Sequence, residues 1–233
     1  MRYKRQKELV NQDLLSSSHV LIAGTGGLGS AALLYLAAAG AGEITIVDAD
    51  NVEESNLNRQ VLHFTTDIGK PKVFSALEKI YELNPEIKVN EKYMRITEET
   101  LSLLPEADIA IDCLDNMETR FLLNKFCVEK NIPLIHAAVE AFEGRLTVII
   151  PGETPCLSCI YAGVPPGKGE FPVIGTTAGI LGVAEASEAI KFLTKKGRIL
   201  AGKMLMLNLL NWEVSLFSTT FNPNCPVCGG GKK

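Results

Sequence analysis

The first half of the chain alternates short apolar runs with longer runs of helical periodicity. Residues 19–24 (HVLIAG) and 43–48 (EITIVD) are typical of buried strands, and the Leu/Ala-rich residues 28–40 form a helix between them, which makes a βαβ unit. The alternation continues with expected helices over 71–83, 98–104 and 117–130 and expected strands over 87–95, 108–114 and 132–137. This order predicts an α/β fold with a doubly wound, mostly parallel, Rossmann-like sheet and helices on both faces.

The pattern becomes less regular after residue 142. The remaining apolar runs predict an antiparallel C-terminal extension with strands over 144–150, 203–210 and 212–219. A long helix is expected over about 175–195, with Glu185, Glu188 and Lys191 as its polar face. Residues 151–172 hold five Pro and four Gly with almost no periodicity, which is typical of a loop.

Composition narrows the class of protein. A chain of 233 residues with 46% hydrophobic and 6% aromatic residues can bury an aliphatic core, so we expect a single domain over 1–233. The formal net charge of −4 leaves no basic excess for a phosphate backbone, and we expect no nucleic-acid partner. The longest apolar stretch, 28–42, is short and rich in Gly and Ala, and the first residues lack a signal-peptide core. We therefore expect a cytoplasmic protein without a membrane partner.

A glycine motif directly follows the first strand. Gly24, Gly26 and Gly29 form G-x-G-x-x-G at the start of a helix, where the backbone can approach a phosphate and the helix offers unpaired N–H groups. Asp48 closes the next strand, about 20 residues later, where a carboxylate usually binds a ribose. Together they predict a nucleotide site, and the motif alone favours NAD or FAD over ATP. Alternatively, the glycines only permit a tight turn and close helix packing.

Cations gather after the second strand, in residues 55–60 (SNLNRQ) and 69–72 (GKPK). Pro71 suits the first position of a helix, which places Lys70 and Lys72 around its first turn. The helix dipole disfavours a cation there by about 0.3–1 kcal/mol unless an anion is close. With Arg59 on the same side of the sheet, a polyphosphate would supply that anion. The alternative is a solvated lysine on a surface turn.

Asp115 follows the apolar run 108–114, at the carboxyl end of an expected strand. Ligands collect at this edge of open α/β sheets, and a carboxylate there could hold Mg²⁺ against phosphates. Residues 115–118 (DNME) also resemble a capping box, with Asp115 or Asn116 capping the following helix. Both functions are compatible. Asp112, inside the run, is expected to be a buried hydrogen-bonding residue.

Four of the six cysteines form two C-x-x-C pairs, Cys156 with Cys159 and Cys225 with Cys228. Such pairs build a closed tetrahedral zinc site, which here would tie the C-terminal segment to the long loop. Two redox dithiols or two disulfides are the alternatives. Cys113 and Cys127 are expected to be small apolar core residues. The single histidines, His19, His63 and His136, are expected to be structural.

The ordered set of motifs resembles the ThiF/MoeB/HesA family of ubiquitin-activating-enzyme-like adenylyltransferases over essentially the whole chain. The set is RYKRQ (2–6), GTGGLG (24–29), VDAD (47–50), SNLNRQ (55–60), GKPK (69–72), DCLDN (112–116), CLSC and CPVC. The resemblance implies a homodimer that binds ATP and Mg²⁺. It also implies adenylation of the C-terminal glycine of a small ubiquitin-like sulfur carrier ending in Gly-Gly, with release of pyrophosphate, for sulfur incorporation in cofactor biosynthesis.

The resemblance also assigns roles to residues. Gly27 and its neighbours look like the nucleotide loop, in a nucleotide-binding half over 1–140, and residues 141–233 hold the crossover loop, C-terminal strands and zinc site. Arg5 resembles the arginine that reaches into the partner subunit's site. The implied catalytic residues are Arg5, Arg59, Lys72 and Asp115, with Arg59 and Lys72 also contacting the triphosphate. The full expected nucleotide-binding set is Gly24, Gly26, Gly27, Gly29, Asp48, Asp50, Ser55, Asn56, Arg59, Gln60, Lys72, Asp115 and Asn116.

One departure from the family pattern concerns thiol chemistry. Many relatives carry a cysteine in the crossover loop, whereas residues 162–182 contain none. We therefore expect an enzyme that stops at the acyl-adenylate. Three other functions stay open at this point: adenylation of a small-molecule or peptide carboxylate, an NAD-dependent oxidoreductase suggested by the glycine motif alone, and a non-catalytic dimeric scaffold.

Overall fold

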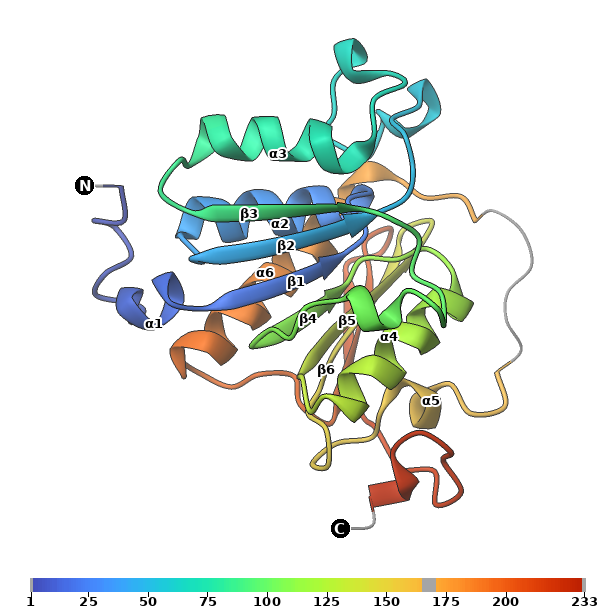
Figure 1. The fold of residues 1–233 in the computed structure, drawn as a ribbon. Helices are drawn as coiled ribbons and strands as arrows, with labels where there is room; N and C mark the ends of the chain where they lie inside the picture. Colours follow the sequence, from blue (N-terminus) through green and yellow to red (C-terminus); the bar gives the residue numbers. More distant parts are fainter. Residues whose placement is uncertain (1, 165–170, 232–233) are drawn as a thin grey trace.

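The computed structural model describes residues 2–164 and 171–231, which form one eight-stranded sheet in the order β3-β2-β1-β4-β5-β6-β7-β8 (Figure 1). The pairs from β3 to β5 are parallel and those from β5 to β8 are antiparallel. The predicted doubly wound sheet with an antiparallel extension is confirmed. The strands are β1 His19–Ala23, β2 Glu43–Asp48, β3 Lys88–Tyr93, β4 Ile109–Asp112, β5 Leu134–Glu140, β6 Glu143–Ile149, β7 Lys203–Asn208 and β8 Glu213–Ser218.

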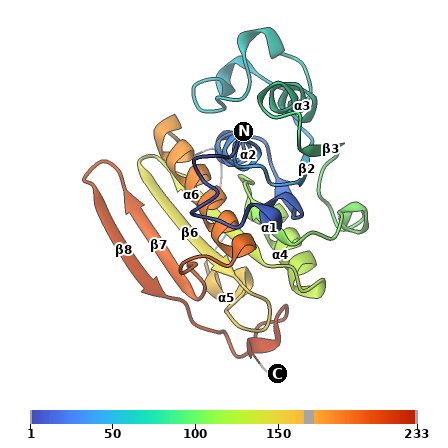
Figure 2. The same cartoon turned by 90° about the vertical axis from the view of Figure 1, so that its left-hand side faces the viewer.

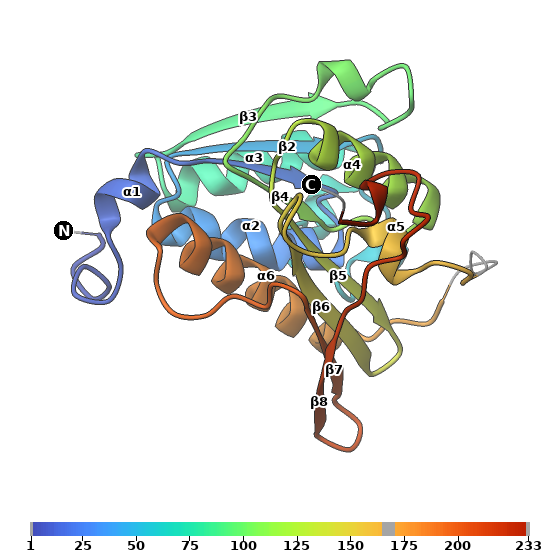
Figure 3. The ribbon, with the colours of Figure 1, turned by 90° about the horizontal axis from the view of Figure 1, so that it is seen from below.

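The helices lie on both faces of the sheet. Helices α2, α3 and α6 pack on one face, and α4 packs on the other, near α5 and the C-terminal segment (Figures 1 and 3). The hairpin of β7 and β8 forms the far edge of the sheet (Figure 2). The helices are α1 Gln12–Ser16, α2 Gly27–Ala39, α3 Lys72–Leu83, α4 Met117–Glu129, α5 Leu157–Ile160 and α6 Gly175–Thr194.

The helix expected over 98–104 is wrong. The segment holds only a 3₁₀ turn, Leu101–Leu103. The Thr100 hydroxyl accepts the Thr97 N–H at 2.8 Å and donates to the Arg95 carbonyl at 2.7 Å, so side-chain bonds compete with helical ones. Leu104 is extended, as expected for the residue before a proline.

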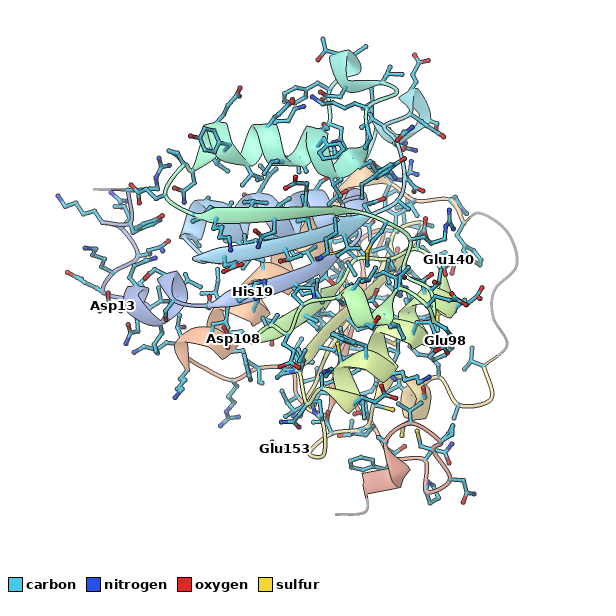
Figure 4. All side chains as sticks on the ribbon, viewed as in Figure 1. Asp13, His19, Glu98, Asp108, Glu140 and Glu153 are labelled. Atoms are coloured by element: carbon cyan, nitrogen blue, oxygen red, sulfur yellow. The ribbon has the colours of Figure 1, made fainter. Side chains whose placement is uncertain are left out.

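A polar contact fixes the amino ends of two parallel strands. At the start of the sheet the Asp108 carboxylate accepts the His19 N–H at 2.8 Å, which aligns β1 with β4 (Figure 4). The carboxyl ends of β1, β2 and β4 meet at the opposite edge of the same sheet, so the segments that follow them are neighbours.

Across the described residues, every helix is too short or too polar to cross a membrane.

The prediction of a polar face on α6 is wrong. Glu185 is fully buried and Glu188 nearly so, because α6 is packed between α2 and strands β5 and β6. Glu188 accepts the Leu200 N–H at 2.8 Å and forms an ion pair with Lys191. Glu185 Oε2 accepts the Cys113 thiol at 3.4 Å. Burial, and then the charge of Asp112, raise the pKa of Glu185 well above its usual range.

Glu185→Gln should therefore change how stability depends on pH. In the folded protein Glu185 keeps its proton at pH values where the unfolded chain has lost it. Folding therefore takes up a proton, and wild-type stability falls above the ordinary pKa near 4.5. The glutamine variant has no such proton to take up. Its free energy of unfolding, relative to that of the wild type, should therefore rise by about 1.4 kcal/mol for each pH unit above the ordinary pKa of Glu185. Urea unfolding from pH 5 to 8 measures the difference, and parallel curves would contradict a protonated Glu185. Glu188→Gln, which removes a paired carboxylate, is the matched control.

Candidate nucleotide site and cysteine cluster

The loop between β1 and α2 can be built only with glycine at two positions. Gly24 has φ of +94°, and a Cβ there would lie 2.6 Å from the Cys113 carbonyl oxygen. A Cβ at Gly29 would lie 2.0 Å from the Gly24 carbonyl oxygen. Gly26 and Gly27 remain partly exposed, and α2 begins at Gly27 without a side-chain cap. The first N–H groups of α2 are therefore available to an anion.

Asp48 holds this loop in place from the end of β2. One carboxylate oxygen accepts the Thr25 N–H at 2.8 Å and the Thr25 hydroxyl at 3.0 Å. The other accepts the Asp50 N–H at 2.9 Å. Asp48 stays half-buried at the carboxyl end of β2, the place from which a carboxylate binds a ribose in dinucleotide-binding folds.

Lys72 lies at the first position of α3, with Pro71 as the residue that precedes the helix. Its side chain is only 7% exposed, and its Nζ lies 3.0 Å from Asp50 Oδ2. Lys70 pairs with Glu78 instead. The anion that a cation requires at a helix N-terminus is therefore supplied by Asp50 in this structure. Asp50 is 56% exposed, so the pair stands at the surface of the site.

Arg59 and Gln60 flank the glycine loop on its other side. A Cβ on Gly27 would lie 3.5 Å from Arg59 Cγ, and the half-buried Arg59 donates to the Ser55 carbonyl and the Asn58 amide oxygen, both at 3.0 Å. Asn56 is half-buried and Ser55 exposed, in the turn Glu54–Asn56. Gln60 is buried beside Gly26, and its Oε1 lacks a hydrogen-bond partner within the described ranges. A buried unpaired acceptor next to the loop fits a site completed by a bound molecule.

Asp115 and Asn116 follow β4 and are both exposed. Asn116 caps α4 through its Oδ1, which accepts the Thr119 N–H at 2.9 Å. Asn116 also donates to Asp115 Oδ1 at 3.3 Å. The capping function therefore belongs to Asn116, which leaves the Asp115 carboxylate as an exposed hard oxygen ligand of the kind that Mg²⁺ prefers.

The structure gathers all expected nucleotide-site residues except Arg5 at the carboxyl ends of β1, β2 and β4. The N-terminal segment that contains Arg5 lies at the opposite end of the sheet, beside α1 (Figure 1). Its position is fixed by Tyr3, whose hydroxyl accepts the Asn84 amide at 2.8 Å and whose ring covers Gly40. Arg5 therefore cannot belong to the site of its own chain.

His63 is a further residue of this region, expected only to be structural. It is buried, with Nε2 3.1 Å from the Thr25 carbonyl and Nδ1 2.8 Å from the Ser75 hydroxyl. Burial lowers the pKa of His63, so the neutral ring donates to Thr25 and accepts from Ser75. It thus ties the glycine loop to α3. The local sequence holds no signal for this link, because the three residues come from separate segments.

The four cysteines of the two C-x-x-C pairs form one cluster. Their Sγ atoms all lie within 4.8 Å of one another, with Cys156 3.6 Å from Cys225 and Cys159 3.4 Å from Cys228. A disulfide needs about 2.05 Å, so the pairs are not bridged, and all four thiols are free. Four thiolates at about 2.3 Å from zinc would stand about 3.8 Å apart. The cluster fits a closed tetrahedral zinc site.

The pKa values of Cys156, Cys159 and Cys228 are shifted in different directions. Burial raises the pKa of Cys156 and raises the pKa of Cys159 to about 11. Burial acts in the same direction on Cys228, but hydrogen bonds from Cys159 and the Gly230 backbone outweigh it and lower the pKa of Cys228 to about 7. Because metals bind the thiolate, occupation of this cluster by zinc would displace protons.

Comparison with known proteins identifies the family. The ThiF family matches residues 3–227. The chain belongs to the ThiF family. It is 38% identical to the SAMP-activating enzyme E1 of Haloferax volcanii, covering 94% of this chain and 83% of that protein. It is 37% identical to the sulfur carrier protein adenylyltransferase of Thermus thermophilus, covering 98% and 90%.

Among solved structures, E. coli MccB with ATP superimposes with a TM-score of 0.85 at 28% identity, covering 98% of this chain and 74% of that one. Together with the match to the family and to the Thermus adenylyltransferase, this likeness shows that the chain is an ATP-dependent adenylyltransferase. This enzyme class sets aside the oxidoreductase suggested by the glycine motif alone.

Cys113 and Cys127 are both buried, as predicted for core residues. Burial raises the pKa of each thiol, and for Cys113 the neighbouring Glu185 adds to the effect. Thiols that are buried and protonated react slowly. Iodoacetamide should therefore modify neither residue in the folded protein incubated with zinc, as peptide mass mapping would show. Rapid labelling of either, together with lost activity, would contradict an enzyme that stops at the acyl-adenylate. Labelling in urea is the positive control.

Proposed function

We propose that this ThiF-family enzyme adenylates the C-terminal glycine carboxylate of a small ubiquitin-like sulfur carrier that ends in Gly-Gly. ATP and the carrier would give an acyl-adenylate and pyrophosphate, for sulfur incorporation in cofactor biosynthesis. The observation that carries the proposal is the convergence of the glycine loop, Lys72, Arg59 and Asp115 at one sheet edge. The acceptor is inferred from relatives named for SAMP activation and for a sulfur carrier.

In this mechanism the carrier carboxylate attacks the α-phosphorus of ATP, and the bond to the bridging oxygen of pyrophosphate breaks. A C-terminal carboxyl group has a pKa of about 3.3–3.7, so the nucleophile is already ionised and needs no general base. The N–H groups at the start of α2 and the cations Arg59 and Lys72 stabilise the negative charge that develops on the departing pyrophosphate. Asp115 would hold Mg²⁺, which would offset further phosphate charge.

The remaining proposed nucleotide contacts follow from their places around the loop. Asp48 would bind the ribose, because its carboxylate stands at the end of β2 beside the loop. Gln60 would offer its unpaired buried oxygen, and Asp50 would release Lys72 toward the phosphates. Ser55, Asn56 and Asn116 would line the same edge.

Arg5 would act in the partner subunit of a homodimer. This is supported by its exposed position at the end of the sheet away from its own glycine loop. Arg5→Ala and Lys72→Met should each be inactive alone. Mixed after denaturation and refolding, they should regain about a quarter of wild-type activity, because half of the dimers carry one intact site. No recovery with confirmed subunit exchange would contradict the shared site.

ATP–pyrophosphate exchange with purified Gly-Gly carriers tests the proposed reaction. Exchange should require ATP, Mg²⁺ and a free carrier C-terminus. A carrier with its C-terminal carboxylate amidated is the matched control, because it keeps the fold of the carrier and removes only the nucleophile. Absence of exchange with every Gly-Gly protein encoded near this enzyme would overturn the carrier as substrate.

A peptide or small-molecule carboxylate is the second candidate acceptor. It is favoured by one observation, that the similar structure of E. coli MccB has been solved together with MccA. Exchange stimulated by such an acid and by no carrier would select this alternative.

A further inference from the structure

A buried polar network lies beneath the loop that carries Asp115 and Asn116. Asp112 and His136 are fully buried and Arg120 is 5% exposed. These residues come from β4, β5 and α4, and the hydrogen bonds of their side chains among the described residues go to Leu114, Tyr161 and one another. Charged groups are rarely buried unless they are paired, because burial removes their hydration. The presence of this network in the interior therefore needs an explanation.

Asp112 and Arg120 hold both backbone groups of Leu114, the residue immediately before Asp115. Asp112 Oδ1 accepts the Leu114 N–H at 3.1 Å, and Arg120 Nη2 donates to the Leu114 carbonyl. Asp112 Oδ1 also lies 3.9 Å from Arg120 Nε. The next turn is fixed as well, because Arg120 N–H donates to the Asn116 carbonyl at 3.2 Å. The backbone is therefore held by hydrogen bonds on both sides of Asp115, at Leu114 and at Asn116.

The same network continues toward α5. Asp112 Oδ2 accepts from His136 Nδ1 at 2.7 Å, and His136 Nε2 lies 3.1 Å from the Tyr161 hydroxyl. Burial lowers the pKa of His136, so the neutral ring donates to Asp112 and accepts from Tyr161. A second hydrogen bond links α4 to α5, because Asn124 Oδ1 accepts the Leu157 N–H at 2.9 Å. The loop therefore has an anchor in the segment that carries Cys156 and Cys159.

Stability alone does not account for this arrangement. A buried ion pair loses hydration, and apolar residues of similar volume often stabilise a fold as well or better. The polar network adds a defined backbone orientation, because its hydrogen bonds to the N–H and carbonyl of Leu114 require one orientation of these groups. We propose that Asp112 and Arg120 are positioning residues that hold the Asp115 carboxylate where it meets the metal–nucleotide complex, with His136 and Tyr161 anchoring Asp112. This inference rests on the proposed role of Asp115.

Arg120→Lys is the sharpest variant. It retains a cation beside Asp112 but lacks the planar guanidinium that can reach the Asp112 carboxylate and the Leu114 carbonyl together. The Mg²⁺ concentration for half-maximal exchange should rise about 10–100-fold, the usual cost of losing a group that orients a metal ligand. The KM for ATP at saturating Mg²⁺ should change less than threefold, and excess Mg²⁺ should restore most of kcat. Tyr161→Phe should give a smaller shift in the same direction, and Glu118→Gln, an exposed acid on the same helix turn, should give none.

Binding separates this inference from the proposed reaction. Calorimetry with a non-hydrolysable ATP analogue, with and without Mg²⁺, needs no acceptor. Mg²⁺ should tighten analogue binding in the wild type and do so about tenfold less in Arg120→Lys. An inactive wild type that still shows this difference would overturn the proposed acceptor alone. Unchanged Mg²⁺ dependence in Arg120→Lys, or equal loss at all Mg²⁺ concentrations, would overturn the positioning role. If Arg120→Lys fails to fold, the uncharged pair Asp112→Asn with Arg120→Gln, which leaves no lone buried charge, decides by the same criteria.

Discussion

Replacing Lys72 by methionine should lower the rate of ATP–pyrophosphate exchange by on the order of 10²–10³-fold, the usual effect of removing one preorganised group that stabilises transition-state charge. Lys72 is held at the first turn of α3 with little freedom, since its side chain is 7% exposed and pairs with Asp50. Methionine keeps the length and the apolar contacts of the stem. The loss should therefore fall mainly on kcat, measured at saturating ATP.

Lys70→Met is the matched control, because Lys70 lies two residues earlier and pairs with Glu78. Its exchange rate should stay within about twofold of the wild type. The stability of Lys72→Met should also change little, because Asp50 is 56% exposed and regains water when the ammonium is lost. A methionine variant that retains full exchange would remove Lys72 from the phosphate contacts. One with a large fall in melting temperature would indicate a structural role instead.

The fold was predictable because its central strands are buried on both sides. β1 and β4 consist mostly of aliphatic residues, and β2 buries Ile44, Ile46 and Val47. Helix α2 lacks a polar face because it packs against α6, α3 and β1. The secondary structure and burial of such apolar runs can be predicted from the local sequence, without knowing which elements pack against them. The failure at Glu185 has the opposite cause. Its spacing on α6 is that of an exposed face, and only the packing of α2 and β5 around α6 makes the position interior.

The sequence could predict that the candidate nucleotide-site residues lie at one end of the parallel strands, but not which contacts each of them makes. Glycines and charges at strand ends mark an edge of the sheet, and the topology brings those ends together. The partners of each residue depend on three-dimensional proximity between distant segments. Asp50 with Lys72, and Asp112 with both His136 and Arg120, are examples. The sequence also could not decide between Asp115 and Asn116 as the helix cap, because only backbone geometry distinguishes them.

Loss of one cysteine from the cluster that fits zinc should have the largest effect on stability. Cys225→Ser should lower the free energy of unfolding by more than about 4 kcal/mol, since metal binding contributes directly to folding energy. For a chain of this size that is a fall of about 8–16 °C in Tm. The cluster joins α5 to the C-terminal segment, and Phe221 and Val227 of that segment pack on the same hydrophobic core. The variant should therefore lose its zinc and expose this segment to proteolysis.

Metal analysis, thermal melts and limited proteolysis measure the three consequences together. A strong chelator added to the wild type should reproduce all three, and re-addition of zinc should reverse them. Cys127→Ala is the matched control, because it removes a buried thiol outside the cluster and should retain one zinc per chain while losing only core packing. If Cys225→Ser keeps its melting temperature and the wild type contains no zinc, the cluster is a set of reduced thiols and the C-terminal segment is held by its apolar contacts with α4 and α5.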